Sequence, residues 1–156
     1  MAKISLQFSS INDIGSALIR AFDHGAFSHV DAIAPGGSLL GARNDALGGM
    51  PAGVQLRGPG YAAFSATKRV DLETTPECAM WFYDFLNKQI GKPYDETAIL
   101  AFAVDRDWRE PESYFCSELI ALALEAAKYF SFPLCAPANK LTPADLLLVL
   151  SAVSPL

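Results

Sequence analysis

The chain has 156 residues, of which 51% are hydrophobic and 19% are charged, so we expect one folded domain over residues 1–156 with a sizeable core. The net charge is −5 and no block of basic residues occurs, which argues against nucleic acid as a partner. The N-terminal stretch MAKISLQFSS lacks the apolar core of a secretory signal, and no apolar run reaches the roughly 20 residues that span a bilayer. We therefore expect a cytoplasmic protein without an integral membrane segment, although a phage or prophage product would have the same features.

The first half of the chain is rich in strand signals. Residues 28–34, SHVDAIA, alternate in polarity and precede the turn PGGS, which predicts a hairpin with a returning strand at 39–44. Residues 45–60 hold five glycines and two prolines, so we expect a long loop there. The other elements predicted in this half are strands at 3–8 and 61–73 and a short helix at 10–22, capped by Ser10 or Asn12.

Helix signals dominate the second half. Residues 74–91 predict a helix with Thr75 as its cap, Pro76 at its first position and Gly91 as its stop. Further helices are predicted within 92–104, from near Tyr114 to about Phe130 with Ser113 as cap, and over 141–153 with Thr142 as cap. Strands early and helices late predict an α+β domain with an antiparallel sheet.

The chain contains three cysteines, Cys78, Cys116 and Cys135. An odd, low number does not suggest a disulfide framework. The only histidines are His24 and His29, and the spacing of these residues matches no zinc motif. We therefore expect no metal site and no cofactor.

Cys116 and Cys78 both lie in the first turn of a predicted helix, where unpaired N–H groups and the helix dipole favour a thiolate. The helix after Cys78 is amphipathic, whereas the stretch after Cys116, LIALALEAA, is apolar almost all round and predicts a central helix. Cys116 is therefore either a nucleophile on a rigid scaffold or a small buried core residue.

A nucleophilic thiol also needs a base. His24 lies in FDHGAF, next to a glycine, which indicates a turn. His29 begins the strand SHVDAIA. A histidine on a strand opposite a cysteine on a helix tip is the arrangement of papain-like hydrolases, and the alternative for His29 is a half-buried structural histidine.

Three blocks of the sequence resemble a known family. The segment RAFDHGAFSHVDAIAPGGSLLGA is similar to the histidine strand of the permuted papain-like amidases, the YiiX-like branch of the NlpC peptidase superfamily, to which lecithin retinol acyltransferases are related. GKPYD and YFCSELIALAL resemble the later landmarks of that family. The resemblance implies a circularly permuted papain-like fold, with an antiparallel sheet packed on a central helix that carries Cys116 at its N-terminus.

By this resemblance Cys116 attacks a carbonyl carbon and His29 is the general base. A third residue usually orients the imidazole, but an ungapped match to the acyltransferase pattern puts it at Gly41, which has no side chain. A hairpin turn centred on Gly36 and Gly37 would place Asn44 opposite His29, and a slip of one residue would bring Arg43 or Asp45 there instead. Asp31 shares a strand face with His29 but lies about 7 Å along it. We therefore predict Asn44, then Asp45, as the third residue.

The resemblance also places Tyr94 and Asp95 near the mouth of the cleft, where they would contact substrate; the alternative is a turn with a packed tyrosine. Tyr114 would flank the nucleophile or pack against the core. Ser117 and Glu118 suit the first turn of a helix, and we expect structural roles for them.

These observations predict a cysteine hydrolase, an amidase, peptidase or acyl transferase that works through an acyl-enzyme on Cys116. The resemblance implies a peptide, a peptidoglycan fragment or an acyl lipid as substrate. Two alternatives remain open at the level of sequence. One is a catalytically inactive papain-like binding or structural module, for example of a phage particle; the other is a redox-sensing thiol protein with a resolving cysteine near Cys116.

Overall fold

The computed structural model describes residues 1–12, 25–94, 115–131, 133, 134, 136 and 138–153. Over these residues the protein is a mixed α+β structure with one antiparallel sheet in the strand order β4-β3-β2-β1-β5. The strands are β1 (Ala2–Ile11), β2 (His29–Ile33), β3 (Leu39–Arg43), β4 (Gly53–Arg57) and β5 (Phe64–Thr74). The helices are α2 (Pro76–Gln89), α4 (Cys116–Ala126), the short 3₁₀ helix η1 (Ala138–Lys140) and α5 (Pro143–Val153).

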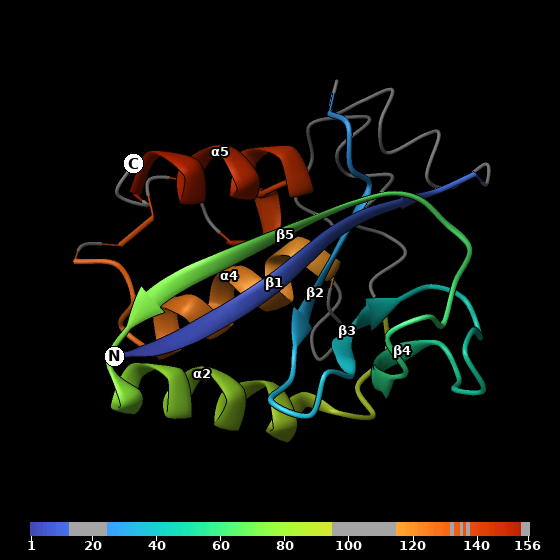
Figure 1. The fold of residues 1–156 in the computed structure, drawn as a ribbon, viewed down its shortest axis with the longest axis horizontal. Coiled ribbons are helices and arrows are strands. Elements are labelled where there is room, and N and C mark those ends of the chain that lie inside the picture. Colours follow the sequence, from blue (N-terminus) through green and yellow to red (C-terminus); the bar gives the residue numbers. More distant parts are fainter. Residues whose placement is uncertain (13–24, 95–114, 132, 135, 137, 154–156) are drawn as a thin grey trace.

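The long strands β1 and β5 pair over almost their whole length, from Ala2 opposite Thr74 to Ser10 opposite Ala66. On its other side β1 pairs with β2, which places His29 opposite Ser9. Figure 1 shows β1 and β5 running across the helices, with β3 and β4 beyond β2. The strands predicted around 3–8, 28–34, 39–44 and 61–73 are thus confirmed.

The prediction of an uninterrupted loop over 45–60 is wrong, because β4 lies within it. β4 pairs with β3, with Leu39 opposite Arg57 and Arg43 opposite Gly53. The strand has only five residues and lies among glycines and prolines, so its local signal is weak. Pairing with β3 supplies the hydrogen bonds that make it a strand.

The helix ends follow the predicted capping residues where the structure describes them. The Thr75 hydroxyl accepts from the N–H of Cys78 at 3.2 Å, and Pro76 begins α2. Thr142 and Asp145 cap α5 reciprocally, each side chain accepting from the backbone N–H of the other at 3.1 Å. The helix expected from near Tyr114 to Phe130 is shorter, Cys116–Ala126, and its N-cap is Phe115. The predicted cap Ser113 and most of the helices expected at 10–22 and 92–104 lie outside the described residues.

One hydrophobic cluster joins the sheet to the described helices α2, α4 and α5. Its members include Phe8 of β1, Phe82 of α2, Leu119 of α4 and Leu146 of α5, each fully buried. In α4, eight of eleven residues are buried, which confirms that it is the central helix, whereas α2 buries only one face. The first residue of α4 is therefore held by packing on several sides.

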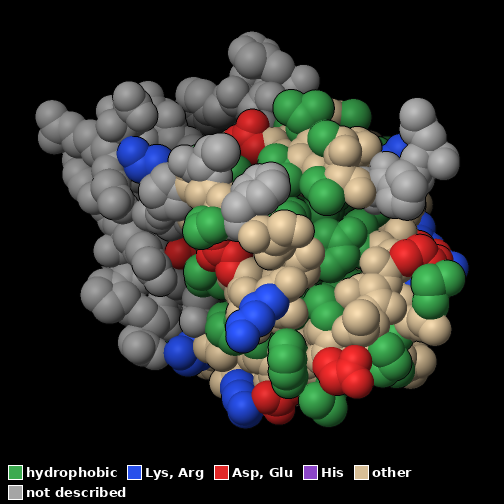
Figure 2. Space-filling model, turned by 90° about the vertical axis from the view of Figure 1, so that its left-hand side faces the viewer, with side chains coloured by type: hydrophobic (Ala, Val, Ile, Leu, Met, Phe, Trp, Pro, Cys, Tyr) green, Lys and Arg blue, Asp and Glu red, His purple; other side chains and the backbone are tan. Residues whose placement is uncertain are grey.

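The described surface is mixed in charge. In Figure 2, basic and acidic side chains are interspersed with apolar ones over the face in view. Among the helices that the structure describes, none is both long and apolar enough to cross a membrane.

Candidate active site

Cys116 is the first residue of α4 and is 1% exposed. The N-cap residue Phe115 accepts from the N–H of Leu119 at 3.0 Å and donates its own N–H to Glu118 at 3.3 Å. Phenylalanine has no side-chain acceptor, so no side-chain cap hydrogen bond covers the N-terminus of this helix. N–H groups at the start of a helix that lack a side-chain cap are the kind of donor that can hold an oxyanion.

The two residues after Cys116 fix the helix tip. The Ser117 hydroxyl donates to the Leu141 carbonyl at 2.5 Å, which ties α4 to the segment before α5. Glu118 accepts from the backbone of Phe115, and both side chains are buried. These contacts support the structural roles expected for Ser117 and Glu118.

His29 is the first residue of β2 and is 7% exposed. Its Nε2 lies 2.9 Å from Oδ1 of Asp31. The Cys116 thiol lies close enough to the ring to contribute to the raised pKa of His29. The structure thus brings together the cysteine and the histidine that the sequence pointed to.

The hairpin register that favoured Asn44 is wrong. Ala32 pairs with Leu40 and Ile33 with Leu39, so the same register continued along β2 brings Arg43, not Asn44, opposite His29. The cause is the turn: Ala34 donates to the Ser38 carbonyl at 2.8 Å around a loop of three residues that ends in Gly37 at φ +87°. Asn44 itself is exposed beyond the end of β3.

Asp31 contacts the imidazole instead. The separation along the strand does not keep the two residues apart, because both side chains lie on one face of β2 and their tips meet. Its carboxylate is fully buried, and its second oxygen accepts from the hydroxyl of Tyr61 at 2.8 Å. Asp45, the second predicted candidate, pairs with Arg43 at 2.7 Å.

Gly41 explains why the carboxylate fits there. A Cβ atom at Gly41 would lie 1.9 Å from Oδ1 of Asp31, which no real contact permits. The strand position where the family resemblance expects the third residue thus has no side chain of its own, and the carboxylate of Asp31 from the neighbouring strand fills the space. Tyr61 gave no signal in the sequence, since it follows the glycine- and proline-rich stretch and becomes a neighbour of Asp31 only when the sheet forms.

Opposing effects set the protonation of His29 and Asp31. Burial lowers the pKa of His29, whereas Asp31, through its charge and its hydrogen bond, and the Cys116 thiol raise it; the balance raises it from 6.5 to about 9. Burial raises the pKa of Asp31, but His29, Tyr61 and Arg43 bring it below its ordinary 3.8. At neutral pH the pair is an imidazolium beside a carboxylate.

The raised pKa of His29 predicts a pH dependence of stability. The contribution of this ring is fully present below its unfolded pKa of 6.5 and is lost as pH rises through about 9. Parent and His29→Gln should therefore differ most in free energy of unfolding near pH 6, and the difference should shrink by about 3 kcal/mol by pH 9.5. Urea denaturation of both proteins at the two pH values measures this, and a difference that stays constant with pH would contradict it.

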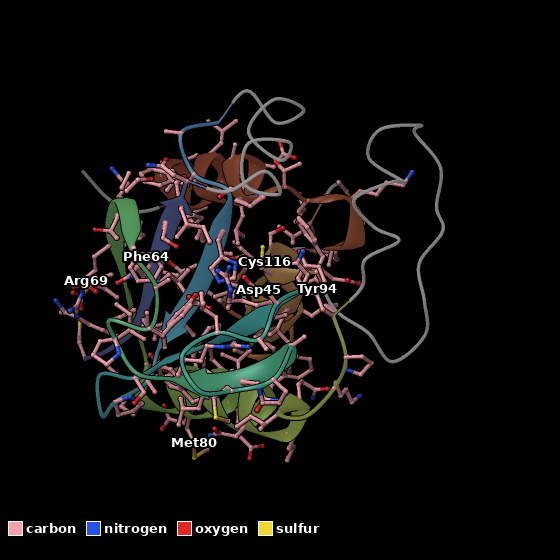
Figure 3. All side chains as sticks on the ribbon, turned by 90° about the vertical axis from the view of Figure 1, so that its right-hand side faces the viewer. Asp45, Phe64, Arg69, Met80, Tyr94 and Cys116 are labelled. Atoms are coloured by element: carbon pink, nitrogen blue, oxygen red, sulfur yellow. The ribbon has the colours of Figure 1, made fainter. Side chains whose placement is uncertain are left out.

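The predicted substrate-binding residues are only partly described. Tyr94 is half-buried, and its ring centroid lies 6.0 Å from that of Phe115, the residue before the nucleophile. Val54 of β4 donates to the Lys92 carbonyl at 2.8 Å, so this segment runs beside the sheet. In Figure 3, Cys116, Tyr94 and Asp45 lie in the same part of the molecule. Asp95 and Tyr114 lie outside the described residues.

Of the other two cysteines and the other histidine, the structure describes only Cys78. Cys78 is buried in the core, with its N–H bonded to the Thr75 hydroxyl. Cys135 and His24 lie outside the described residues. Within the described ranges, no group of three or more His, Cys, Asp or Glu side chains is arranged to hold a metal ion.

No protein-family model matches this chain, and a search of curated proteins finds no significant relative.

Proposed function

We propose that this protein is a cysteine hydrolase or acyl transferase with a permuted papain-like fold, in which Cys116 is the nucleophile, His29 the acid and base, and Asp31 the residue that orients His29. The observation that carries the proposal is a buried arrangement in which His29 contacts the Asp31 carboxylate and lies near enough to the Cys116 thiol for the thiol to affect its pKa. Two further features support the permuted arrangement. The histidine lies on a strand and the cysteine at the tip of a central helix, and the histidine precedes the cysteine in the chain.

The chemistry follows from the protonation of His29. With its pKa raised to about 9, the ring is protonated at neutral pH and can act as the counterion of the attacking sulfur. The thiolate attacks a carbonyl carbon and forms the C–S bond, while the backbone N–H groups at the start of α4 hold the oxyanion. The intermediate collapses as His29 gives its proton to the leaving amine or alkoxide, which leaves a thioester and a neutral imidazole.

Deacylation reverses these steps. A water, or an acceptor alcohol or amine, gives a proton to His29 and attacks the thioester carbonyl, and the C–S bond breaks. The thiolate and the imidazolium are restored. Asp31 keeps the ring in place throughout and balances its charge. The classes of substrate that we propose are peptides, peptidoglycan fragments and acyl lipids, which share the amide or ester carbonyl that this chemistry needs.

The test is the rate of Cys116 alkylation by iodoacetamide at pH 6, followed by mass spectrometry in the parent and in His29→Gln. We expect Cys116 to react faster than Cys78, because Cys78 has no histidine partner among the described residues and its helix N-terminus is capped by Thr75. The variant should remove that advantage. A Cys116 that reacts no faster than Cys78, and is indifferent to His29, would count against the proposal.

A non-catalytic binding module is the second candidate, and the burial of Cys116, at 1% exposed, favours it. In that case Cys116 and His29 are core residues that a papain-like fold retains. Acetylation of Cys116 by p-nitrophenyl acetate, detected as an added acetyl mass, distinguishes the two candidates. A binding module would show no acetyl-enzyme at pH 7.

A further inference from the structure

Behind the candidate triad, the hydroxyl of Tyr61 lies between a buried carboxylate and a cation. It donates to Oδ2 of Asp31 at 2.8 Å and accepts a longer contact from Nη1 of Arg43 at 3.4 Å. Asp31 thus uses one oxygen for His29 and the other for Tyr61. None of the hydrogen bonds described for this carboxylate comes from a guanidinium.

The ring of Tyr61 is held from several sides. The guanidinium carbons of Arg43 and Arg57 lie 5.5 and 5.6 Å from its centroid, and Phe64 meets it edge to face at 5.2 Å. A Cβ atom at Gly48 would lie 2.6 Å from Cβ of Tyr61, so the backbone passes this residue closely. The hydroxyl therefore has a fixed position, set by contacts of the ring rather than by Asp31 alone.

Both arginines have other partners. Arg43 pairs through two nitrogens with Asp45, at 2.7 and 3.0 Å. Arg57 is almost fully buried and donates to the carbonyls of Leu47, Gly41 and Pro51. Two separate charge pairs result, His29 with Asp31 and Arg43 with Asp45, and the Tyr61 hydroxyl lies where they would otherwise meet.

We propose that Tyr61 is a positioning residue that keeps Arg43 from pairing with Asp31, so that the carboxylate remains the partner of His29. Arginine and carboxylate form strong two-pronged pairs, and a buried carboxylate that loses a donor takes the nearest one available. Without the hydroxyl, Arg43 would turn to Oδ2 and neutralise Asp31. The expected effect of Tyr61 on catalysis rests on the proposed function. Its expected effect on the pairing of Asp31 with His29 does not.

The groups that bear on Asp31 come from each element around it. They are His29 on its own strand, Arg43 on β3, Arg57 on β4, Tyr61 in the connection to β5, Asp45 behind Arg43, and Cys116 of α4 through the imidazole. Burial and the charge of Asp31 raise the pKa of Tyr61, so it is a neutral donor at any pH of interest. Of these groups, Tyr61 can lose its hydroxyl without a change in formal charge.

The experiment is a titration of the His29 imidazole by NMR in the parent, Tyr61→Phe and Tyr83→Phe, with the signal assigned through His29→Gln. Tyr83→Phe is the matched control, because its hydroxyl donates at 2.8 Å to the carbonyl of Ile33 on the same strand but does not contact Asp31. Tyr61→Phe should lower the pKa of His29 by at least about one unit and slow Cys116 alkylation about tenfold at neutral pH, while Tyr83→Phe leaves both unchanged.

The double variant Tyr61→Phe with Arg43→Gln tests the cause. With no guanidinium to compete for Asp31, the pKa of His29 should return toward the parent value. An unchanged or raised pKa in Tyr61→Phe overturns the proposal, as does a double variant that stays low. The pKa of His29 could respond as expected in a protein whose Cys116 is inert. That result would support the role of Tyr61 and contradict the proposed hydrolase function.

Discussion

Asp31→Asn is expected to slow acetylation of Cys116 by p-nitrophenyl acetate at pH 7 by at least about a hundredfold, since loss of the corresponding charge in a serine protease triad costs about 10⁴. The substitution keeps the size of the side chain but removes the charge and the hydrogen bond that raise the pKa of His29. Burial of the ring then dominates, the imidazole is neutral at pH 7, and the thiolate loses its counterion. Stopped-flow detection of nitrophenolate, with mass spectrometry of the acetyl-enzyme, measures the rate.

Two variants accompany this measurement. Asn44→Ala removes the residue that the predicted hairpin register favoured, and it should leave the rate within about twofold, because Asn44 is exposed. Asp71→Asn makes the same chemical change at a carboxylate that instead contacts Ser5 and Arg69. Equal rates in Asp31→Asn and Asp71→Asn would show that Asp31 does not act on His29. Urea denaturation of each variant separates a loss of folding from a loss of reactivity.

Gly41→Ala is expected to be the most damaging addition of a single methyl group at the site. The new Cβ would overlap Oδ1 of Asp31 at 1.9 Å and would also crowd the Val30 carbonyl at 3.3 Å. Either the carboxylate leaves the imidazole or β3 moves, so we expect a loss of about 1–3 kcal/mol in free energy of unfolding. The pKa of His29 should also fall toward 6.5, as read by NMR.

Gly58→Ala is the matched control for this substitution. A Cβ at Gly58 meets nothing within 4 Å, and its φ is not in the left-handed region. This variant should stay within about 0.5 kcal/mol of the parent and leave His29 unchanged. If Gly41→Ala behaves in the same way, then the carboxylate of Asp31 does not occupy the space beside Gly41 in solution.

The helices show what local chemistry specifies. Thr75 and Pro76 predicted the start of α2, and Thr142 that of α5, because a cap acts on N–H groups within the same helical turn. The almost wholly apolar stretch after Cys116 predicted a central helix for the same kind of reason: burial on all sides needs apolar residues on all sides. β4 was missed because a five-residue strand gets its stability from its neighbour rather than from its own sequence.

For the candidate site, the sequence by itself pointed to Cys116 and His29, through their places at a helix start and a strand start and through the family resemblance. The tertiary structure decided the residue that orients His29. The turn is one residue longer than predicted, and this shifts every cross-strand pair, so Asn44 does not lie opposite the imidazole. The absence of a side chain at Gly41 leaves space for the carboxylate of Asp31. Tyr61 reaches that carboxylate, and Arg43 reaches Tyr61, only when β2, β3 and the loop before β5 come together. Such contacts depend on the register between strands and on the space beside a residue without a side chain. Neither can be read from one segment of the sequence, because both involve residues far apart in the chain.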